Sequence, residues 1–422
     1  MMSCTRCVLV LGCLFGSAGT ALGEPSSVEE GSFASDEVVL EWNAIAVDTI
    51  GATPPPPSSR FMATAQLAVF EAVDAITAEY EPYLGALTAP PGASTEAAAA
   101  AAAHGVLAGF FPDAAAALDQ KLATSLSAID DGEAKEDGIL VGEEAAALML
   151  AERANDGSAP ALFFVPADRD PGDWQPTPSC PPDGGTLKHW RDVEPFGILS
   201  SSQFRAAPPF PINSRCYARD FAEVKAVGGA SSTQRPADRT NVAQLYAAQP
   251  PHVGWNSMAR QLASARHDSI TATARTLALL NVAMADAIIS VFESKYHYAY
   301  WRPETAIARA DEDENDETVA DATFTPLVVT PCHPSYPSGH GAAAGAASSV
   351  LVDAYGQGDH DLTNTNPTLP GVELHYTRID EIVRDISDAR VFGGIHFRND
   401  QNAAELMGHR VAAYDLEHLL TP

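Results

Sequence analysis

The feature that most constrains the fold is a run of alanine between residues 95 and 105, where the sequence reads TEAAAAAAAHG. Alanine has the highest intrinsic helix propensity, and its short side chain lets neighbouring helices approach closely. A chain built around such a run is expected to form tightly packed helices. Hydrophobic residues make up 46% of the sequence and charged residues only 19%, which is typical of a folded globular chain and not of a disordered one.

Apolar residues recur at helical spacing in several further parts of the sequence. Pro112 begins one of these parts at a position where proline favours the first turn of a helix, and an Asn-Asp-Gly stop ends another at residue 157. The sequence shows no alternating β pattern, no G-x-G-x-x-G motif, no phosphate-binding Walker loop and no G-x-S-x-G motif. We therefore predict an all-α fold. The predicted helical segments are residues 58–80, 111–129, 138–157, 338–356, 378–394 and 398–420, together with one or two helices that begin near residue 257 and end near Tyr300.

The first residues of the chain are typical of an export signal. Arg6 supplies an early positive charge, an apolar run follows over residues 8–15, and the small residues at 21–23 fit a cleavage site. A lipid-attachment site at Cys13 is an alternative that the few apolar residues before it make less favourable. We therefore predict a secreted or periplasmic protein. The apolar run is too short to span a bilayer, and we expect no membrane span elsewhere.

A long proline-rich span covers residues 155–215. Spans of this length are usually functional or serve as linkers. Because this one contains Trp174, Trp190, Phe196 and Phe204, we predict an ordered segment that wraps over the helices, with no chemistry of its own. The chain then divides into a signal peptide at residues 1–23, an N-terminal helical region at residues 24–215 and a C-terminal helical bundle at residues 216–422.

Three of the six cysteines remain if the signal peptide is removed, namely Cys180, Cys216 and Cys332. An odd number in an exported protein allows one disulfide and leaves one thiol. A Cys180–Cys216 pair is one option, because both residues lie in loop-like sequence. The remaining cysteines form no Cys-x-x-Cys pair, so we expect no structural zinc site.

The formal net charge of the chain is −30, and its isoelectric point is near 4.5. This charge argues against nucleic acid and anionic membrane surfaces as partners. An anion-binding site in such a chain must be built from local positive charge. The acidic run at residues 311–317 is predicted to be a solvated loop, since it lacks the spaced glycine and carbonyl ligands of a calcium site.

Three short segments concentrate cations, histidines and small residues. In KYHYAYWRP, Lys295 and Arg302 are seven residues apart, which places them on one face of a helix. In PSYPSGHG, Ser338 offers a hydroxyl, the Gly339 amide lies at a helix start that favours negative charge, and His340 offers an acid or a base. Taken singly, Lys295 fits a helix-end cation and Ser338 a helix cap.

The third segment, ARVFGGIHFRND, contains Arg390, His396 and Asp400. Arg390 offers paired donors to an oxyanion. His396 can present one ring nitrogen to a central atom, and Asp400 can hold the other N–H and fix the tautomer. Taken singly, Arg390 fits a surface charge and His396 an ordinary loop histidine, so the joint pattern carries the argument.

Together the three segments read Lys-x6-Arg-Pro, Pro-Ser-Gly-His and Arg-x5-His-x3-Asp over residues 295–400. This pattern resembles the signature shared by the type-2 phosphatidic-acid phosphatase superfamily and the vanadium-dependent haloperoxidases. One position departs from the phosphatase form, because Ala389 stands where those enzymes have serine. The length of the chain, its helical N-terminal half and the wording of the three segments favour the haloperoxidases.

The resemblance implies two helical bundles, with the oxyanion site in the C-terminal bundle. It further implies vanadate as cofactor, with hydrogen peroxide and a halide as substrates. In this scheme His396 binds vanadium axially, His340 relays a proton, Lys295 polarises the bound peroxide and Asp400 supports His396. The residues implied in vanadate or phosphate binding are Lys295, Arg302, Ser338, Gly339, His340, Arg390 and His396.

A secreted acid phosphatase of the same superfamily is the alternative function. Phosphate and vanadate are nearly isosteric, so the same residues would serve both. In the phosphatase, His396 would attack a phosphate ester to form a phosphohistidine, and His340 would protonate the leaving oxygen. An inactive helical protein with a vestigial site is disfavoured, because every signature residue is present.

His333 lies five residues before Ser338, where bromoperoxidases of the family have histidine and the chloroperoxidase type has phenylalanine. We predict that its ring faces the vanadate pocket and keeps it polar, and that bromide and iodide are favoured over chloride. The alternative is a histidine that only caps the proline-rich turn. The sequence leaves open the organic substrate, the vanadate loading and a homo-oligomeric state.

Overall fold

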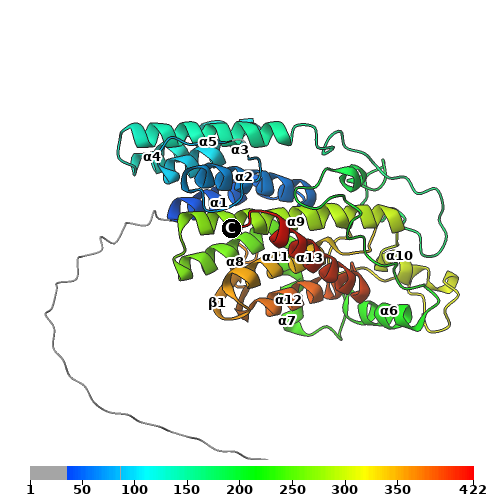
Figure 1. Cartoon of the computed structure of the whole chain (residues 1–422). Helices are drawn as coiled ribbons and strands as arrows, with labels where there is room; N and C mark the ends of the chain where they lie inside the picture. Colours follow the sequence, from blue (N-terminus) through cyan, green and yellow to red (C-terminus); the bar gives the residue numbers. More distant parts are fainter. Residues whose placement is uncertain (1–35, 86) are drawn as a thin grey trace, which may run out of the picture. The chain divides into compact units, whose positions relative to one another are not determined.

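A computed structural model describes residues 36–85 and 87–422 of the chain. Its N-terminal part is a bundle in which α3 contacts each of the other helices, as Figure 1 shows. The predicted signal peptide, residues 1–23, lies outside the described residues, and export stays a prediction. The helices of this bundle are α1 (Glu37–Ile50), α2 (Pro55–Thr77), α3 (Thr95–Phe110), α4 (Ala115–Ser127), preceded by the short 3-10 turn η1 (Pro112–Ala114), and α5 (Glu133–Glu152).

The alanine run forms α3, and it packs closely against α5. The alanines at 97–103 are at most 1% exposed. Two glycines of α5, Gly138 and Gly142, lie directly on the α3 backbone. A Cβ atom added at Gly142 would come within 2.4 Å of the Ala98 carbonyl oxygen. The small residues on both helices therefore permit the close approach that the sequence predicts.

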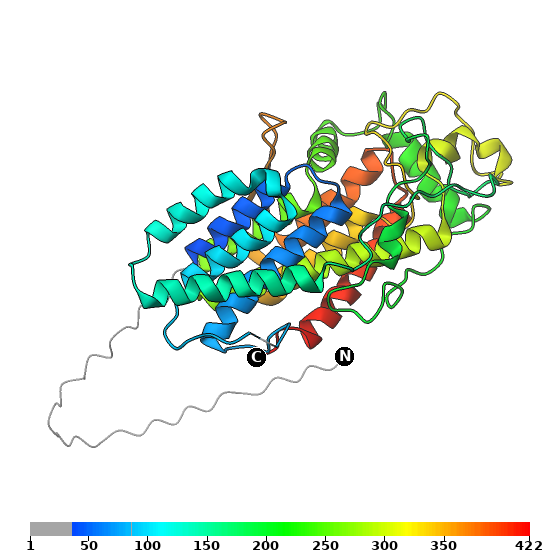
Figure 2. The ribbon, with the colours of Figure 1, turned by 90° about the horizontal axis from the view of Figure 1, so that it is seen from above.

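A second bundle is arranged around the long helix α9, which contacts α2 on one side and α11 and α13 on the other. The all-α fold with two bundles is thus confirmed, and Figure 2 shows the two groups of helices lying along each other. The remaining elements are α6 (Arg215–Val227), α7 (Ala237–Ala248), α8 (Pro251–Arg266), α9 (Ile270–Tyr298), α10 (Pro303–Ala308), η3 (Ala310–Glu312), α11 (Gly339–Tyr355), α12 (Ile379–Phe392) and α13 (Arg398–His418).

The length and hydropathy of α9 suffice, by composition alone, for a membrane span. The expectation that no such stretch follows the signal peptide was therefore wrong on those two criteria. The apolar 18-residue window of α9 is, however, entirely buried inside the fold. Its contacts with α2, α11 and α13 account for its apolar character as that of a central core helix.

The structure also contains one antiparallel hairpin, which the sequence pattern did not reveal. Strands β1 (Gly358–Thr365) and β2 (Glu373–Arg378) pair after α11. Leu362 and Asn364 are the residues of β1 that are buried, and Tyr376 is the buried residue of β2. Strands with so few apolar residues give no alternating hydrophobic signal, which explains why the sequence pattern did not reveal them.

The proline-rich span is ordered and packs over the C-terminal end of α9. Trp174, Trp190 and Phe196 are buried, and the short 3-10 turn η2 (Lys188–Asp192) contacts α9. The carboxylate of Asp286 in α9 accepts hydrogen bonds from three consecutive backbone amides at residues 196–198, at 2.7–3.0 Å. These bonds hold the span against the second bundle.

The disulfide joins Cys180 to Cys332, so a Cys180–Cys216 pair was wrong. Cys216 lies in α6 and not in a loop, and its thiol is free and exposed. The bridge ties the proline-rich span to the segment that precedes α11. The described residues cluster as one unit, and the predicted boundary between residues 215 and 216 stays a prediction.

Candidate functional site

The three sequence segments meet at one cavity of about 490 Å³, whose wall also includes residues 52–56 of the first bundle and residues 186–187 of the proline-rich span. The segments come from the end of α9, the turn that leads into α11, and the region where α12 gives way to α13. Arg302 and Ser338 lie next to this cavity without lining it. The residues predicted from sequence that do line it are Lys295, His333, Gly339, His340, Arg390 and His396.

Lys295 lies in the last turn of α9 and is completely buried. Its Nζ donates hydrogen bonds to the carbonyl oxygens of Pro334 and Ser335, at 2.7 and 2.8 Å. Burial lowers the pKa of Lys295 well below its usual value, and the nearby Arg302 lowers it further. The turn before α11 thus holds the Lys295 side chain in a buried position, where the protonated form is destabilised.

Arg302 holds the site together because its guanidinium contacts two of the other segments. Its Nε donates to the His333 carbonyl at 2.9 Å, and its Nη1 donates to the Ile395 carbonyl at 2.8 Å. Nη1 also lies 3.1 Å from Nε2 of His396. Arg302 is completely buried, and burial lowers its pKa to about 9.

Arg390, at the end of α12, is only 4% exposed and has few partners. Its Nη1 donates to the Tyr246 carbonyl at 3.3 Å, while its Nε is buried without a hydrogen-bond partner. Burial lowers the pKa of Arg390 to about 10. A buried guanidinium with an unused N–H group is available to an acceptor that enters the cavity.

The protein groups at this site carry more positive than negative charge. Lys295, Arg302 and Arg390 are all buried, and Asp400 is the carboxylate that hydrogen-bonds within the same cluster. Burying unpaired charges costs several kcal/mol or shifts their pKa values, and the pKa values of all three cations are lowered. An anion in the cavity would remove this cost, so the site is suited to an oxyanion.

His396 is held in one orientation by Asp400. Its Nδ1 lies 2.8 Å from Oδ2 of Asp400, which also accepts from the Ser335 hydroxyl at 2.6 Å and from the Phe397 amide at 3.2 Å. Burial, followed by the charge of Arg302, lowers the pKa of His396 well below its usual value. A neutral ring with its proton on Nδ1 leaves the lone pair of Nε2 on the side of Arg302.

Burial raises the pKa of Asp400 to about 6, although Ser335 and Lys295 oppose the shift. Near neutral pH the carboxylate is therefore charged and accepts the Nδ1 proton of His396. Sequence reasoning assigned this role to Asp400 but missed Ser335, which supports the same oxygen. Ser335 lies between His333 and Ser338, outside the Pro-Ser-Gly-His signature, and the sequence gave no separate signal for it.

Ser338 caps α11, as its sequence context suggests. Its hydroxyl oxygen accepts from the Gly341 amide at 3.3 Å, and its own amide donates to the Asp400 carbonyl at 3.0 Å. The hydroxyl proton remains available to a ligand. Gly339 lies on the cavity wall at the N-terminus of the helix, where the dipole favours an anion.

His340 and His333 lie on the cavity wall. Burial lowers the pKa of both rings well below the usual value; for His340 the next cause is Arg390, and for His333 it is Lys295. Nδ1 of His333 is 3.1 Å from Nη2 of Arg302, and its ring packs on Phe292 at 5.2 Å between centroids. His333 therefore contacts the cation cluster as well as the turn.

Comparisons with known proteins agree with this geometry. Residues 275–421 match the family model described as the VCPO second helical-bundle domain. A crystal structure of a bacterial vanadium-dependent iodoperoxidase aligns with a TM-score of 0.77 at 24% identity, covering 94% of this chain and 99% of that one. An apo-type bacterial vanadium-dependent chloroperoxidase aligns with a TM-score of 0.70 at 16% identity, covering 87% and 95%.

At these identities the solved structures show a shared fold. Together with the family model they confirm the resemblance to the vanadium-dependent haloperoxidase family that the signature residues predict. A search among curated proteins found no match.

Proposed function

We propose that this protein is a vanadate-dependent haloperoxidase that uses hydrogen peroxide to oxidise a halide to hypohalous acid. The observation that carries the proposal is the cluster of three buried cations beside a neutral histidine at the wall of a cavity. Such a cluster would fit an anion with several oxygens whose central atom accepts a histidine nitrogen. The shared fold and the family of the second bundle support the same assignment.

The residues present fit vanadate as the cofactor. Lys295, Arg302 and Arg390 would neutralise its oxygens, with the unused Nε of Arg390 as one donor. The Ser338 hydroxyl and the Gly339 amide would add donors at the start of α11. His396 would hold the vanadium through Nε2, because Asp400 engages Nδ1. When bound, vanadate would supply a Lewis-acidic centre that activates hydrogen peroxide.

The remaining residues would move protons and exclude water. His340, neutral near pH 7 because burial lowers its pKa, is ready to take a proton as hydrogen peroxide enters and to return it as water leaves. Lys295 would hold a donor N–H against the reacting oxygen and increase its electrophilic character. The buried walls of the cavity strengthen these interactions.

We further propose that bromide and iodide are the preferred halides. The support is His333, which lies in the cavity wall and beside Arg302. Its ring keeps this part of the wall polar, where a phenylalanine would make the cavity drier and the cations less screened. A less screened site would be the stronger oxidant that chloride requires.

Export to an oxidising compartment is also part of the proposal. The disulfide between Cys180 and Cys332 supports it, because disulfides form and persist in secreted and periplasmic proteins. Hydrogen peroxide and halide ions would reach the enzyme there.

A bromination assay on protein freed of bound anions tests the proposed function. Activity should depend on added orthovanadate and on hydrogen peroxide, and phosphate should suppress it by competition. A phosphatase assay on the same preparation provides the contrast, because the two functions share their binding residues. Hydrolysis of a phosphate ester without any vanadate-dependent bromination would favour the phosphatase and contradict the proposal.

A further inference from the structure

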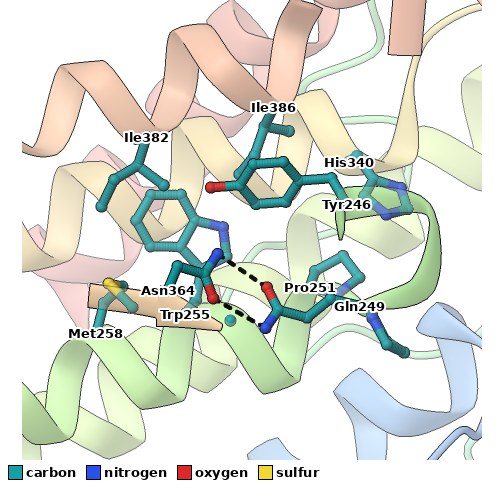
Figure 3. A pocket seen from close by; sticks show the side chains of 11 residues that line it. Tyr246, Gln249, Pro251, Trp255, Met258, His340, Asn364, Ile382 and Ile386 are labelled. Atoms are coloured by element: carbon teal, nitrogen blue, oxygen red, sulfur yellow. Dashed lines mark hydrogen bonds between the residues drawn. The ribbon is translucent and has the colours of Figure 1, made fainter. Parts of the chain in front are cut away.

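His340 also lines a second and smaller cavity (Figure 3). Its volume is about 10 Å³, which is room for one atom-sized ligand or one water. Gln249 and Pro250 line both cavities, as His340 does. We refer to this smaller cavity as the halide slot. Of the residues proposed above to bind the oxyanion, His340 is the one that lines the halide slot.

Most of the side chains that line the slot are apolar, and two of them are polarisable. Trp255 and Met258 of α8 and Ile382 and Ile386 of α12 form its walls. The aromatic ring and the thioether are polarisable groups. Such walls suit a large, weakly hydrated ion better than a small, strongly hydrated one.

The amide groups in the slot already have partners. The side-chain amide of Gln249 donates to Asn364 at 2.9 Å, and that of Asn364 donates back at 3.0 Å, as the dashed lines in Figure 3 show. The Tyr246 hydroxyl is paired with that of Tyr376 at 2.9 Å. A bound water needs two to four polar partners, and these groups have little left to offer it.

One donor in the slot is unused. Trp255 is only 2% exposed, and its Nε1–H has no hydrogen-bond partner. The indoles of Trp174, Trp190 and Trp301 are unpartnered as well, but they do not line this slot. A lone N–H donor calls for a ligand that accepts a hydrogen bond and need not donate one.

The local charge favours an anion. Pro251, Gly254 and Trp255 belong to the first turns of α8, where the helix dipole is positive. Arg390 is bonded to the carbonyl of Tyr246, which is part of the wall. The slot is lined by no carboxylate, and the nearby Asp385 is already paired with Arg239 at 2.6 Å.

We propose that the slot binds a single iodide or bromide ion, with Trp255 Nε1–H as its donor, next to His340. This inference rests on the proposed function, since it assigns the second substrate a place beside the peroxide-activating centre. Trp255 is then a residue that determines halide affinity. It does not contact the oxyanion, because it does not line the larger cavity.

The test uses vanadate-free full-length protein and iodide itself as the probe. Crystals soaked in iodide should show an anomalous peak within hydrogen-bonding distance of Trp255 Nε1. In solution, calorimetric titration should give an iodide Kd that rises at least about tenfold in Trp255→Phe, because a hydrogen bond to a charged ligand is lost. Trp190→Phe is the matched control, and its iodide affinity should equal that of the wild type.

Steady-state kinetics on vanadate-loaded protein add a second readout. Trp255→Phe should raise the KM for iodide by about the same factor while kcat and the vanadate affinity stay unchanged. An anomalous map of the wild type without a peak in the slot overturns the inference, even if the variant does not fold. An unchanged Kd in Trp255→Phe overturns it as well.

The outcomes separate this inference from the proposed function. Iodide bound in the slot of a protein that oxidises no halide would leave the site standing and contradict the function. Iodide oxidation with a wild-type KM for iodide in Trp255→Phe would support the proposed function and contradict the halide site. A peak at the high iodide concentration of the soak, with no saturable binding in solution, would show an adventitious ion only and would overturn the site.

Discussion

The centre of the first bundle and the site of the second are equally buried but differ in what they bury. The alanines at 97–103 in α3 are at most 1% exposed, and the three cations of the site are at most 4% exposed. Burial of apolar groups against the glycines of α5 stabilises the fold. Burial of cations with one carboxylate lowers stability unless an anion joins them. The comparison indicates that the first region stabilises the fold. The second region lowers the stability of the free protein, and an anion that binds there would remove this cost.

The replacement of Arg390 by methionine should separate the two effects most clearly. Arg390→Met should weaken orthovanadate binding by at least about hundredfold, because charged hydrogen bonds to the ligand are lost. Without vanadate, the variant should be as stable as the wild type or more stable, because a buried charge is removed. Calorimetric titration and urea unfolding measure both quantities. A loss of stability with intact vanadate affinity would reverse the assignment of Arg390.

The opposite result is expected in the first bundle for Gly142→Ala. The added Cβ would meet the backbone of α3 at 2.4 Å, so the helices must move apart and the free energy of unfolding should fall by about 2 kcal/mol. Vanadate affinity should stay unchanged. Gly109→Ala is the matched control, because its Cβ would meet only the flexible Leu150 side chain. Equal losses in the two variants would argue against the close contact of α3 with α5.

A pH series sharpens the same comparison through Lys295, whose pKa is lowered by burial. The folded chain releases this proton at a lower pH than the unfolded chain, so stability should rise as pH increases from the lowered pKa towards about 10.4. Urea unfolding of vanadate-free wild type between pH 7 and pH 10 should therefore show a gain relative to Lys295→Met. The gain should be up to about 1.4 kcal/mol per pH unit.

Phosphate provides the control for the pH series. A bound anion keeps Lys295 protonated, so saturating phosphate should flatten the difference between wild type and Lys295→Met. A difference that is constant with pH in the absence of anions would show that Lys295 keeps its ordinary pKa.

The smallest effect is expected for His333→Phe. The phenylalanine would remove the contact to Arg302 and make the cavity drier, and we expect a several-fold rise in the ratio of chloride to bromide turnover. The alternative is that His333 only stabilises the turn, where its backbone N–H donates a hydrogen bond to the Pro331 carbonyl. Steady-state rates for chloride, bromide and iodide decide between them, and an unchanged ratio leaves His333 as a turn residue.

The helices that the sequence predicts are those with a strong apolar period or an alanine run, such as α2, α3, α9 and α11. Helices α1, α6, α7 and α10 were not predicted. The hairpin after α11 was missed because its buried positions include Asn364 and few apolar residues. The disulfide partner of Cys180 was missed because pairing depends on which segments meet in space, and the sequence shows only that Cys332 is 152 positions away.

The structure brings together residues that the sequence pattern selected, because spacing and chemistry define that pattern, and their roles stay predictions. Lys295 and Asp400 lie more than a hundred positions apart, so local sequence could not show that they share a site. The resemblance to the family signature grouped them. The hydrogen bonds that support the site residues could not be predicted from the signature. The Ser335 hydroxyl on Asp400 and the Tyr246 carbonyl on Arg390 come from packing between segments that no motif links.

Equilibrium titration of anion-free protein with orthovanadate tests the central claim most directly. We predict one saturable site per chain, competition by phosphate, and much weaker binding in His396→Ala with the helical content retained. The helical content should be retained because His396 lies between α12 and α13 and belongs to neither helix. Absence of saturable vanadate binding to the wild type, or binding that phosphate does not displace, would contradict the assignment of the buried cation cluster as an oxyanion site.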